Sequence, residues 1–334
     1  MIKLKDRYNR VHNYLRISLT DRCNLKCLYC NPDDFQLRYS KRTDILNFDE
    51  ILRIIKIFTG SFGFNKIRFT GGEPFVRKEI LHLFEEADKL KSTYNFDVGI
   101  TTNGTLLEDK IESLKKFGVD KLNISLDSLD KDKFKLITGK DNFESIMRSI
   151  NKAMDLGFSP LKINVVVLKN INDNEIVDFV DFAVDKNLNI RFIEFMPFGN
   201  NSWSKDTFIS YKELKTRVEE KYILEEIPSN NGKVAKDFNI IDHPGSVSFI
   251  SSLSDNFCGS CNRLRITATG KMKLCLFSNG ENEINFKQLL SGVKYSDEQI
   301  CEVIQDAIQF KLEKHPEPEE LAKLEENNML TLGG

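Results

Sequence analysis

Three cysteines stand close together near the start of the chain, in the run DRCNLKCLYC. Cys23, Cys27 and Cys30 have the spacing C-x3-C-x2-C and directly follow a β-branched segment. Three thiolates can bind three corners of a four-iron cluster and leave one iron without a protein ligand. A small molecule can bind that open iron, so the spacing predicts a catalytic iron–sulfur cluster.

A structural zinc site and three unrelated buried cysteines are the alternatives for this first cysteine group. Structural zinc takes four ligands, and no fourth Cys or His lies nearby, because His12 is on the far side of the predicted strand. With only 7 cysteines in 334 residues, three within eight positions are improbable by chance. Both observations favour the iron cluster.

A second cysteine group lies more than two hundred residues later, at Cys258, Cys261 and Cys275. Its spacing, C-x2-C-x13-C, again provides three ligands without an obvious fourth. A zinc ribbon is the serious alternative, since C-x2-C is the common zinc knuckle. His243 is the nearest candidate to complete such a site, but its distance in sequence and the following Pro244 argue against it.

Arg263 and Arg265 come directly after this second group, on a segment with strand propensity. Residues two apart on a strand point to the same face. Two guanidinium groups on one face suit an anion between them, and their forked geometry matches phosphate oxygens. The alternative, two solvated surface arginines, is less favoured beside a cluster ligand.

The elements that position these residues alternate between strands and helices over the first two thirds of the chain. Such alternation predicts right-handed βαβ units around a parallel sheet. Polar residues follow each predicted strand, at the end where barrel enzymes carry their chemistry. Six strand segments are predicted, beginning at Leu15, Lys66, Val98, Leu122, Lys162 and Ile190, and the main helices lie in 49–60, 78–90 and 142–157.

Six units are fewer than the eight of a closed barrel, and the regular alternation stops near Gly199. We therefore expect an α/β fold: a partial (β/α)6 TIM-like barrel at 1–198, with a C-terminal α+β extension at 199–334 closing the open side. The extension is predicted to hold a helix near 212–222, strands from Gly245, Arg263 and Lys271, and helical structure over 286–323.

Composition limits the kinds of partner. The net charge is -2, with 29% charged and 40% hydrophobic residues, so no overall field favours nucleic acid or an anionic membrane. The start, MIKLKDRYNR, lacks the apolar region of a signal peptide, and no apolar run is long enough to cross a bilayer. We expect a cytoplasmic protein whose cysteines bind metal or act in catalysis.

The first cysteine group, with Tyr29 before its last cysteine and the GGEP run at 71–74, resembles the radical S-adenosylmethionine superfamily. The resemblance implies that the amino and carboxylate groups of S-adenosylmethionine bind the open iron and that the backbone at Gly72 meets the methionine ammonium. It also implies that Tyr29 approaches the adenine, that Ser125 contacts the cofactor, and that Met196 lines the adenine pocket. Taken singly, Ser125 and Met196 would be ordinary strand-end and core residues.

The C-terminal pattern C-x2-C-N-R-x-R-x-T-x2-G-x4-C-L, with a terminal Gly-Gly, closely resembles the GTP 3',8-cyclase family of molybdenum-cofactor biosynthesis. The resemblance implies a second [4Fe-4S] cluster on the second cysteine group, with its open iron on the guanine. Gly333 and Gly334 would brace the arginines, where composition alone would suggest a frayed terminus. The implied GTP-binding residues are Arg16, Arg68, Thr101, Lys162, Arg263 and Arg265.

The resemblance also implies a reaction. A radical from S-adenosylmethionine would remove hydrogen from the ribose 3' carbon of GTP, and that carbon would attack guanine carbon 8. The product is (8S)-3',8-cyclo-7,8-dihydroguanosine 5'-triphosphate, the first intermediate of molybdopterin synthesis. An electron donor and the downstream cyclic pyranopterin monophosphate synthase are the implied partners, and a homodimer is left open. The alternatives are a peptide-modifying radical enzyme with an auxiliary cluster and a zinc-bound adaptor.

Overall fold

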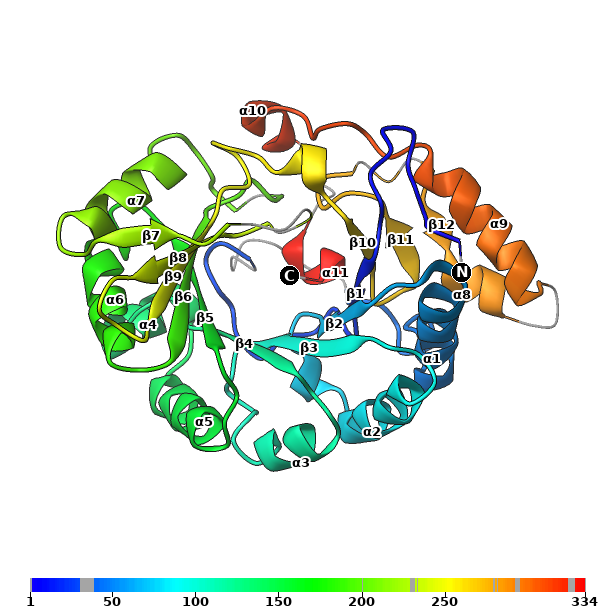
Figure 1. The fold of residues 1–334 in the computed structure, drawn as a ribbon, viewed down its shortest axis with the longest axis horizontal. Helices are drawn as coiled ribbons and strands as arrows, with labels where there is room; N and C mark the ends of the chain where they lie inside the picture. The colour runs from blue at the N-terminus through cyan, green and yellow to red at the C-terminus, as the bar shows by residue number, and fades with distance from the viewer. Residues whose placement is uncertain are drawn as a thin grey trace.

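The strands of the protein form one mixed sheet that curves into an open barrel (Figure 1). The computed structural model describes residues 2–30, 39–199, 201–228, 232, 234–278, 280, 282–291, 295–323 and 328–333. The sheet has 12 strands in the order β12-β11-β10-β1-β2-β3-β4-β5-β6-β9-β8-β7.

The six central strands are parallel and confirm the six predicted strand segments. They are β1 (Tyr14–Ser18), β2 (Lys66–Thr70), β3 (Asp97–Thr102), β4 (Lys121–Ser125), β5 (Leu161–Val167) and β6 (Leu188–Glu194). Helices cover their outer side (Figure 1). These are α1 (Phe48–Lys56), which continues as a π-helix (Ile57–Ser61), α2 (Ile80–Lys91), α3 (Ile111–Lys116), α4 (Lys131–Thr138), α5 (Phe143–Asp155) and α6 (Ile176–Val184).

The C-terminal part lengthens the sheet at both edges. On β6 lie β9 (Ser246–Ile250), which is parallel to it, and then the antiparallel β8 (Lys236–Ile240) and β7 (Leu224–Glu226). On β1 lie β10 (Arg263–Ile266), also parallel, and then the antiparallel β11 (Lys271–Lys273) and β12 (Ile284–Asn285). The remaining helices are α7 (Tyr211–Glu219), α8 (Phe286–Leu290), α9 (Asp297–Ile308), α10 (Pro318–Leu321) and α11 (Met329–Leu332).

This arrangement confirms the partial barrel with its C-terminal α+β extension. The strands of the extension pair with both edge strands of the barrel, β6 and β1, and among the described strands β7 and β12 are the two edges of one continuous sheet. The division at 198/199 stays a prediction, since the sheet runs across it. The strands predicted from Arg263 and Lys271 pair as the antiparallel hairpin β10–β11, and β11 ends at Lys273, so Cys275 lies beyond the strand.

Alternation along the strands gives the barrel an apolar outside and a polar inside. On β1, Leu15 and Ile17 are fully buried under the helices, while Arg16 between them lines an internal cavity. The register aligns Arg16 with Arg68 of β2 on one side and Arg265 of β10 on the other. Closed barrels fill this space with Val, Ile and Leu, so a polar interior here favours a binding cavity.

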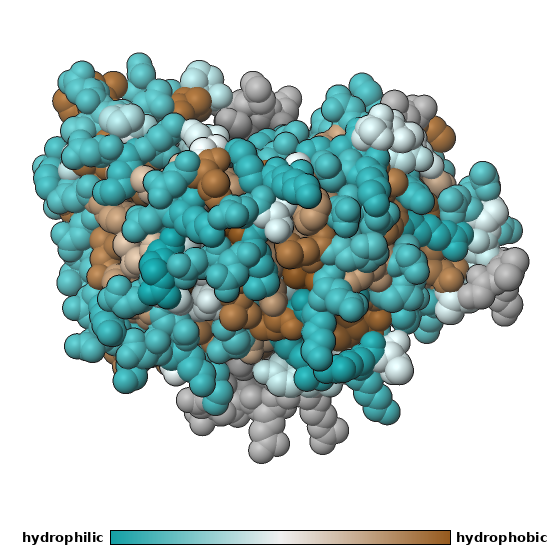
Figure 2. Space-filling model, turned by 90° about the horizontal axis from the view of Figure 1, so that it is seen from below, coloured by the Kyte–Doolittle hydropathy of each residue, from teal (hydrophilic) through white to brown (hydrophobic). Residues whose placement is uncertain are grey.

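The outer surface over α2, α3 and α5 is mostly hydrophilic, with apolar side chains visible in smaller areas between the polar ones (Figure 2). Among the described residues, no helix is long and apolar enough to span a membrane.

Candidate active site

The first cysteine group lies at the carboxyl end of β1 and lines one cavity, here the first cavity. Gly71, Gly72, Tyr29 and Ser125 line the same cavity, as predicted from sequence for a common site. The Gly72 amide donates to Thr20 O at 2.7 Å, and a Cβ on Gly72 would lie 2.4 Å from Arg22 O. Only glycine permits this contact, which presses the cysteine loop against the end of β2.

Burial has the largest effect on the pKa values of the three cysteines in the first group. It raises the pKa of Cys23 to about 11, and it raises the pKa of Cys27 and of Cys30, with Asp127 and the neighbouring thiolates adding to the effect. Tyr29 Oη donates to Asp127 at 2.7 Å, and burial raises the pKa of Asp127 to about 6. Three thiolates here need a strongly positive partner, which the irons of a cluster provide, so the donor set fits one.

Buried polar groups outside the motif hold this loop in place. Arg77 donates to Leu19 O at 2.8 Å and to Leu46 O at 2.6 Å, so one guanidinium ties together the two ends of the loop segment. Glu73 accepts bonds from Thr102 Oγ1 and the Asn103 amide, and burial raises its pKa to about 7. These positioning roles were not predicted from sequence, although the Glu of GGEP is a signal for one of them.

The second cysteine group lines another cavity inside the barrel, here the second cavity. The first and second cavities share lining residues and therefore adjoin inside the barrel: both include Thr101, Asn164, Ile193 and Met329. Two cysteine groups more than two hundred residues apart in sequence thus border one continuous space.

Five arginines line the second cavity, and among its described lining residues there is no carboxylate. Four of them, Arg16, Arg68, Arg263 and Arg265, were predicted from sequence, and Arg191 on β6 was missed. Period-two alternation could have found it, because Ile190 and Phe192 on either side are fully buried.

The surroundings of these arginines favour a bound anion. Burial, then Arg263, lowers the pKa of Arg265 to about 10, and burial, then Arg68, lowers that of Arg191 to about 10. The Nε atoms of Arg191 and Arg263 are buried and make no hydrogen bond within the described part of the chain. Uncompensated buried cations are costly, so the cavity favours a polyanionic ligand.

Tyr14 lies among these arginines and was not singled out from sequence. Its hydroxyl accepts from Arg68 Nε at 2.7 Å, and the Arg263 guanidinium lies 5.1 Å from its ring centre. Burial alone would raise the pKa of Tyr14, but Arg68, Arg16 and Arg263 lower it to about 6.

Lys162 lies in a lower cavity at the amino end of the strands, next to the second cavity. Lys66 and Lys121 line this lower cavity too, and Arg68, Arg191 and Arg263 border both cavities. Burial, then Arg191, lowers the pKa of Lys162 to about 7. Lys66, for which no role was predicted, adds a further cation to the lower cavity, which Asp97 and Asp237 also line.

The tail residue Gly333 lies at the second cavity's arginines. Arg265 Nη1 donates to Gly333 O at 3.0 Å, and a Cβ on Gly333 would lie 2.6 Å from Ser18 Cβ. The short helix α11 before it lies inside the barrel (Figure 1). Gly334 lies outside the described residues.

Met196 lines the second cavity and is not among the lining residues of the first, where Tyr29 lies. The two residues are linked through Asn201, whose amide donates to Tyr29 O at 3.0 Å and to Met196 O at 2.9 Å. Asn256 accepts from the Cys258 amide at 3.3 Å and shapes the second cysteine loop.

The second group differs from the first in its charge environment. Burial would raise the pKa of Cys261, but Lys311, a bond from the Arg263 backbone and the Arg263 charge together lower it. Cys258 has a raised pKa because of burial. Among the described residues no three His, Cys, Asp or Glu side chains form a group that could hold one metal ion. Each cysteine group lines a cavity instead. Three thiolates beside a cavity fit a cluster that leaves one iron open to a ligand.

Two family models match the chain. The Radical SAM superfamily model matches residues 17–183, and the Molybdenum Cofactor Synthesis C model matches residues 188–317. A solved structure of Streptococcus suis SuiB bound to S-adenosylmethionine has a similar fold, with a TM-score of 0.60 and 18% identity, covering 89% of this chain and 69% of that one.

Curated relatives cover nearly the whole chain. A mitochondrial GTP 3',8-cyclase of Arabidopsis thaliana is 41% identical over 99% of this chain and 83% of its own length. Molybdenum cofactor biosynthesis protein 1 of Dictyostelium discoideum is 45% identical over 99% of this chain, which spans 52% of that relative's length. Several of the curated relatives are thus about twice as long as the chain.

The Petrotoga mobilis GTP 3',8-cyclase is 39% identical over 93% of this chain and 94% of its own length. With the two cysteine groups facing one arginine-lined interior, these matches establish that the chain belongs to the GTP 3',8-cyclase family of the radical S-adenosylmethionine superfamily.

Proposed function

We propose that this chain converts GTP to (8S)-3',8-cyclo-7,8-dihydroguanosine 5'-triphosphate, the first step of molybdenum-cofactor synthesis. One observation carries the proposal: the two cysteine groups border adjoining cavities, and five arginines line the second. A nucleoside triphosphate matches this arrangement, because its phosphates can neutralise the arginines while its ribose lies between the two cysteine groups.

Two [4Fe-4S] clusters and S-adenosylmethionine are the cofactors of this family. When bound, the cluster on Cys23, Cys27 and Cys30 supplies the one-electron reduction that cleaves S-adenosylmethionine. Gly72, Tyr29 and Ser125 border the same cavity and would orient the cofactor. Met196 would contact it from the second cavity, where the ribose of GTP would approach.

The second cavity would hold GTP. The guanine would lie at Cys258, Cys261 and Cys275, and the arginines would bind the phosphates. Lys162, with Lys66, would extend the phosphate site at the lower end, while Thr101 borders both cavities. Gly333, and Gly334 after it, would keep Arg265 aimed inward and help exclude water.

The partners and the cellular location belong to the same proposal. A one-electron donor must reduce the cluster, and the cyclised nucleotide is the substrate of a cyclic pyranopterin monophosphate synthase. We retain a cytoplasmic location as a prediction, although one relative is named as mitochondrial. The oligomeric state, including a homodimer, is a matter for solution measurement.

Anaerobic incubation with S-adenosylmethionine, dithionite and GTP tests the function. We expect 5'-deoxyadenosine to form in step with the cyclised nucleotide, and to drop to background when ATP replaces GTP. Cofactor cleavage that is the same with and without GTP would contradict the assignment.

A further inference from the structure

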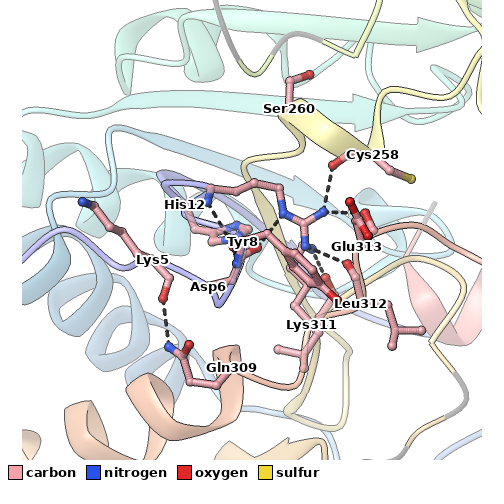
Figure 3. A network of polar contacts seen from close by, with 12 residues as sticks. Lys5, Asp6, Tyr8, His12, Cys258, Ser260, Gln309, Lys311, Leu312 and Glu313 are labelled. Atoms are coloured by element: carbon pink, nitrogen blue, oxygen red, sulfur yellow. Dashed lines mark hydrogen bonds and ion pairs between the residues drawn. The ribbon is translucent and has the colours of Figure 1, made fainter.

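Two buried cations from opposite ends of the chain hold the backbone of the second cysteine loop. Figure 3 shows the polar network that joins Asp6, Cys258, Leu312 and Glu313. The first cation is Arg10. Its guanidinium donates to Cys258 O at 2.8 Å, to Glu313 O at 2.7 Å and to Leu312 O at 2.7 Å. Its Nε donates to Asp6 Oδ2 at 2.6 Å, so a carboxylate compensates its charge.

The second cation is Lys311, whose side chain comes from the segment after α9. It is only 3% exposed, and its Nζ donates to Leu274 O and, at 3.2 Å, to Arg263 O. Leu274 directly precedes Cys275, and Arg263 follows Cys261 by two residues. Arg10 and Lys311 together therefore contact the backbone at or beside all three cysteines of the second group.

Lys311 differs from Arg10 in its charge balance. No carboxylate in the described ranges forms an ion pair with Lys311, whose ammonium group donates to the carbonyl oxygens of Arg263 and Leu274. A buried ammonium without a compensating anion is destabilising. The thiols of Cys258, Cys261 and Cys275 line the same cavities as Lys311, so their thiolates would place negative charge beside it.

Lys311 also lies beside the three cysteines of the second group. Lys311 and all three cysteines line the second cavity, and the same four residues line a separate outer cavity. Among the described residues that line the first cavity there is no lysine or arginine, and the carboxylate of Asp127 lies there instead.

We propose that Lys311 is a positioning residue that raises the reduction potential of the cluster held by Cys258, Cys261 and Cys275, with Arg10 fixing the loop. Reduction adds negative charge to the cluster, and a nearby buried cation stabilises the reduced form. The inference rests on the proposed function only in requiring that the second group hold a cluster. It gives the second cluster a higher potential than the first.

The test uses the full chain with Cys23, Cys27 and Cys30 all replaced by Ser, so that only the second cluster gives a signal. Lys311→Met and Lys311→Gln remove the charge, and the glutamine keeps a donor for the two carbonyls. After anaerobic reconstitution, iron is counted and the midpoint potential is measured by titration with electron paramagnetic resonance. Lys314→Met is the matched control, because its side chain is 68% exposed.

We expect both Lys311 variants to lower the midpoint potential while Lys314→Met leaves it unchanged. A cluster present at full iron content with an unchanged potential in both Lys311 variants would overturn the proposal. Iron loss in both, with a normal potential for the remaining cluster, would also overturn it, because the role would then be structural only. Arg10→Lys, which keeps the charge, should lower iron content more than potential, and the reverse would count against the division of roles.

Failure of this inference is distinguishable from failure of the proposed function. A second cluster with the expected potential shift but no GTP-dependent cleavage would support Lys311 and contradict the cyclase assignment. Zinc instead of a reducible cluster at the second group would overturn the role of Lys311, while the GTP incubation would still decide the activity.

Discussion

The two cysteine groups have the same number of ligands but opposite surroundings. The first loop is pressed against a glycine turn, with Asp127 and Glu73 nearby, and burial raises the pKa of its thiols. The second loop is open to solvent at Gly259 and Ser260 and has Lys311 and Arg263 beside it. Local charge, together with solvent exposure, sets the potential of an iron–sulfur cluster.

This difference fits a division of labour. A cluster that must donate an electron to S-adenosylmethionine benefits from nearby negative charge, which disfavours its reduced form. A cluster that binds an anionic nucleotide benefits from nearby cations. The two loops can therefore share a ligand pattern and perform different tasks, and each substitution below separates one task from the other.

The largest expected effects come from removing one ligand in each group. Cys27→Ala should abolish 5'-deoxyadenosine formation, because the cofactor would lose its reducing cluster. Cys261→Ala should abolish the cyclised nucleotide while leaving slow cofactor cleavage that no longer depends on GTP. Chromatography of both products checks this. Loss of all cleavage in Cys261→Ala, with the first cluster intact by electron paramagnetic resonance, would break the division.

Removing a cavity arginine should have the next largest effect. Arg265→Ala and Arg263→Ala should each weaken GTP binding by about 1.5 to 3 kcal/mol, the contribution of a charged hydrogen bond, which is roughly 10- to 150-fold in affinity. Equilibrium binding of GTP to the reconstituted protein measures this. S-adenosylmethionine binding is the control and should not change. Unchanged GTP affinity in both variants would contradict the assignment of the phosphate site to the second cavity.

Much of this site could be predicted from sequence because its residues lie in short, regular patterns. The cysteine spacings, the GGEP turn and the two arginines of β10 each occupy fewer than twenty positions, and strand alternation fixes which side chains share a face. The six barrel strands were found for the same reason. Gly72 and Cys23 then meet because parallel strands bring their carboxyl ends to one edge.

The parts that were missed depend on contacts across long stretches of chain. Lys311 and Arg10 lie in no recognisable motif. Their contacts with the second cysteine loop form only because segments near both chain ends pack against it, so their role could not be predicted from sequence. Arg77 is similar, since its acceptors are two backbone carbonyls. The pairing of β9 with β6 and of β10 with β1 was likewise not predicted, because local strand propensity does not reveal to which sheet edge a strand pairs.

A smaller effect is expected from replacing one glycine at each cysteine loop, and only the glycine at the first loop should affect S-adenosylmethionine binding. Gly72→Ala places a Cβ 2.4 Å from Arg22 O and should weaken S-adenosylmethionine binding, since overpacking costs roughly 1 to 3 kcal/mol. Gly259→Ala meets nothing within 4 Å and should leave both clusters and both affinities unchanged. Calorimetric titration with the cofactor compares them. Equal losses in the two variants would contradict the close packing of the first loop.

The smallest expected effect is a pH dependence of GTP binding through Lys162. Its pKa is lowered to about 7 in the free protein, so at higher pH the amine is neutral and must take up a proton to pair with phosphate. GTP affinity should therefore fall as pH rises above about 7, by at most about tenfold per pH unit. Binding measured between pH 7.5 and 8.5 should show this slope, and Lys162→Gln should flatten it. Tyr14→Phe is the control, because Tyr14 has a pKa of about 6 and is already ionised throughout this range. A slope that survives in Lys162→Gln would assign the titration to another group and would separate the lower cavity from the phosphate site.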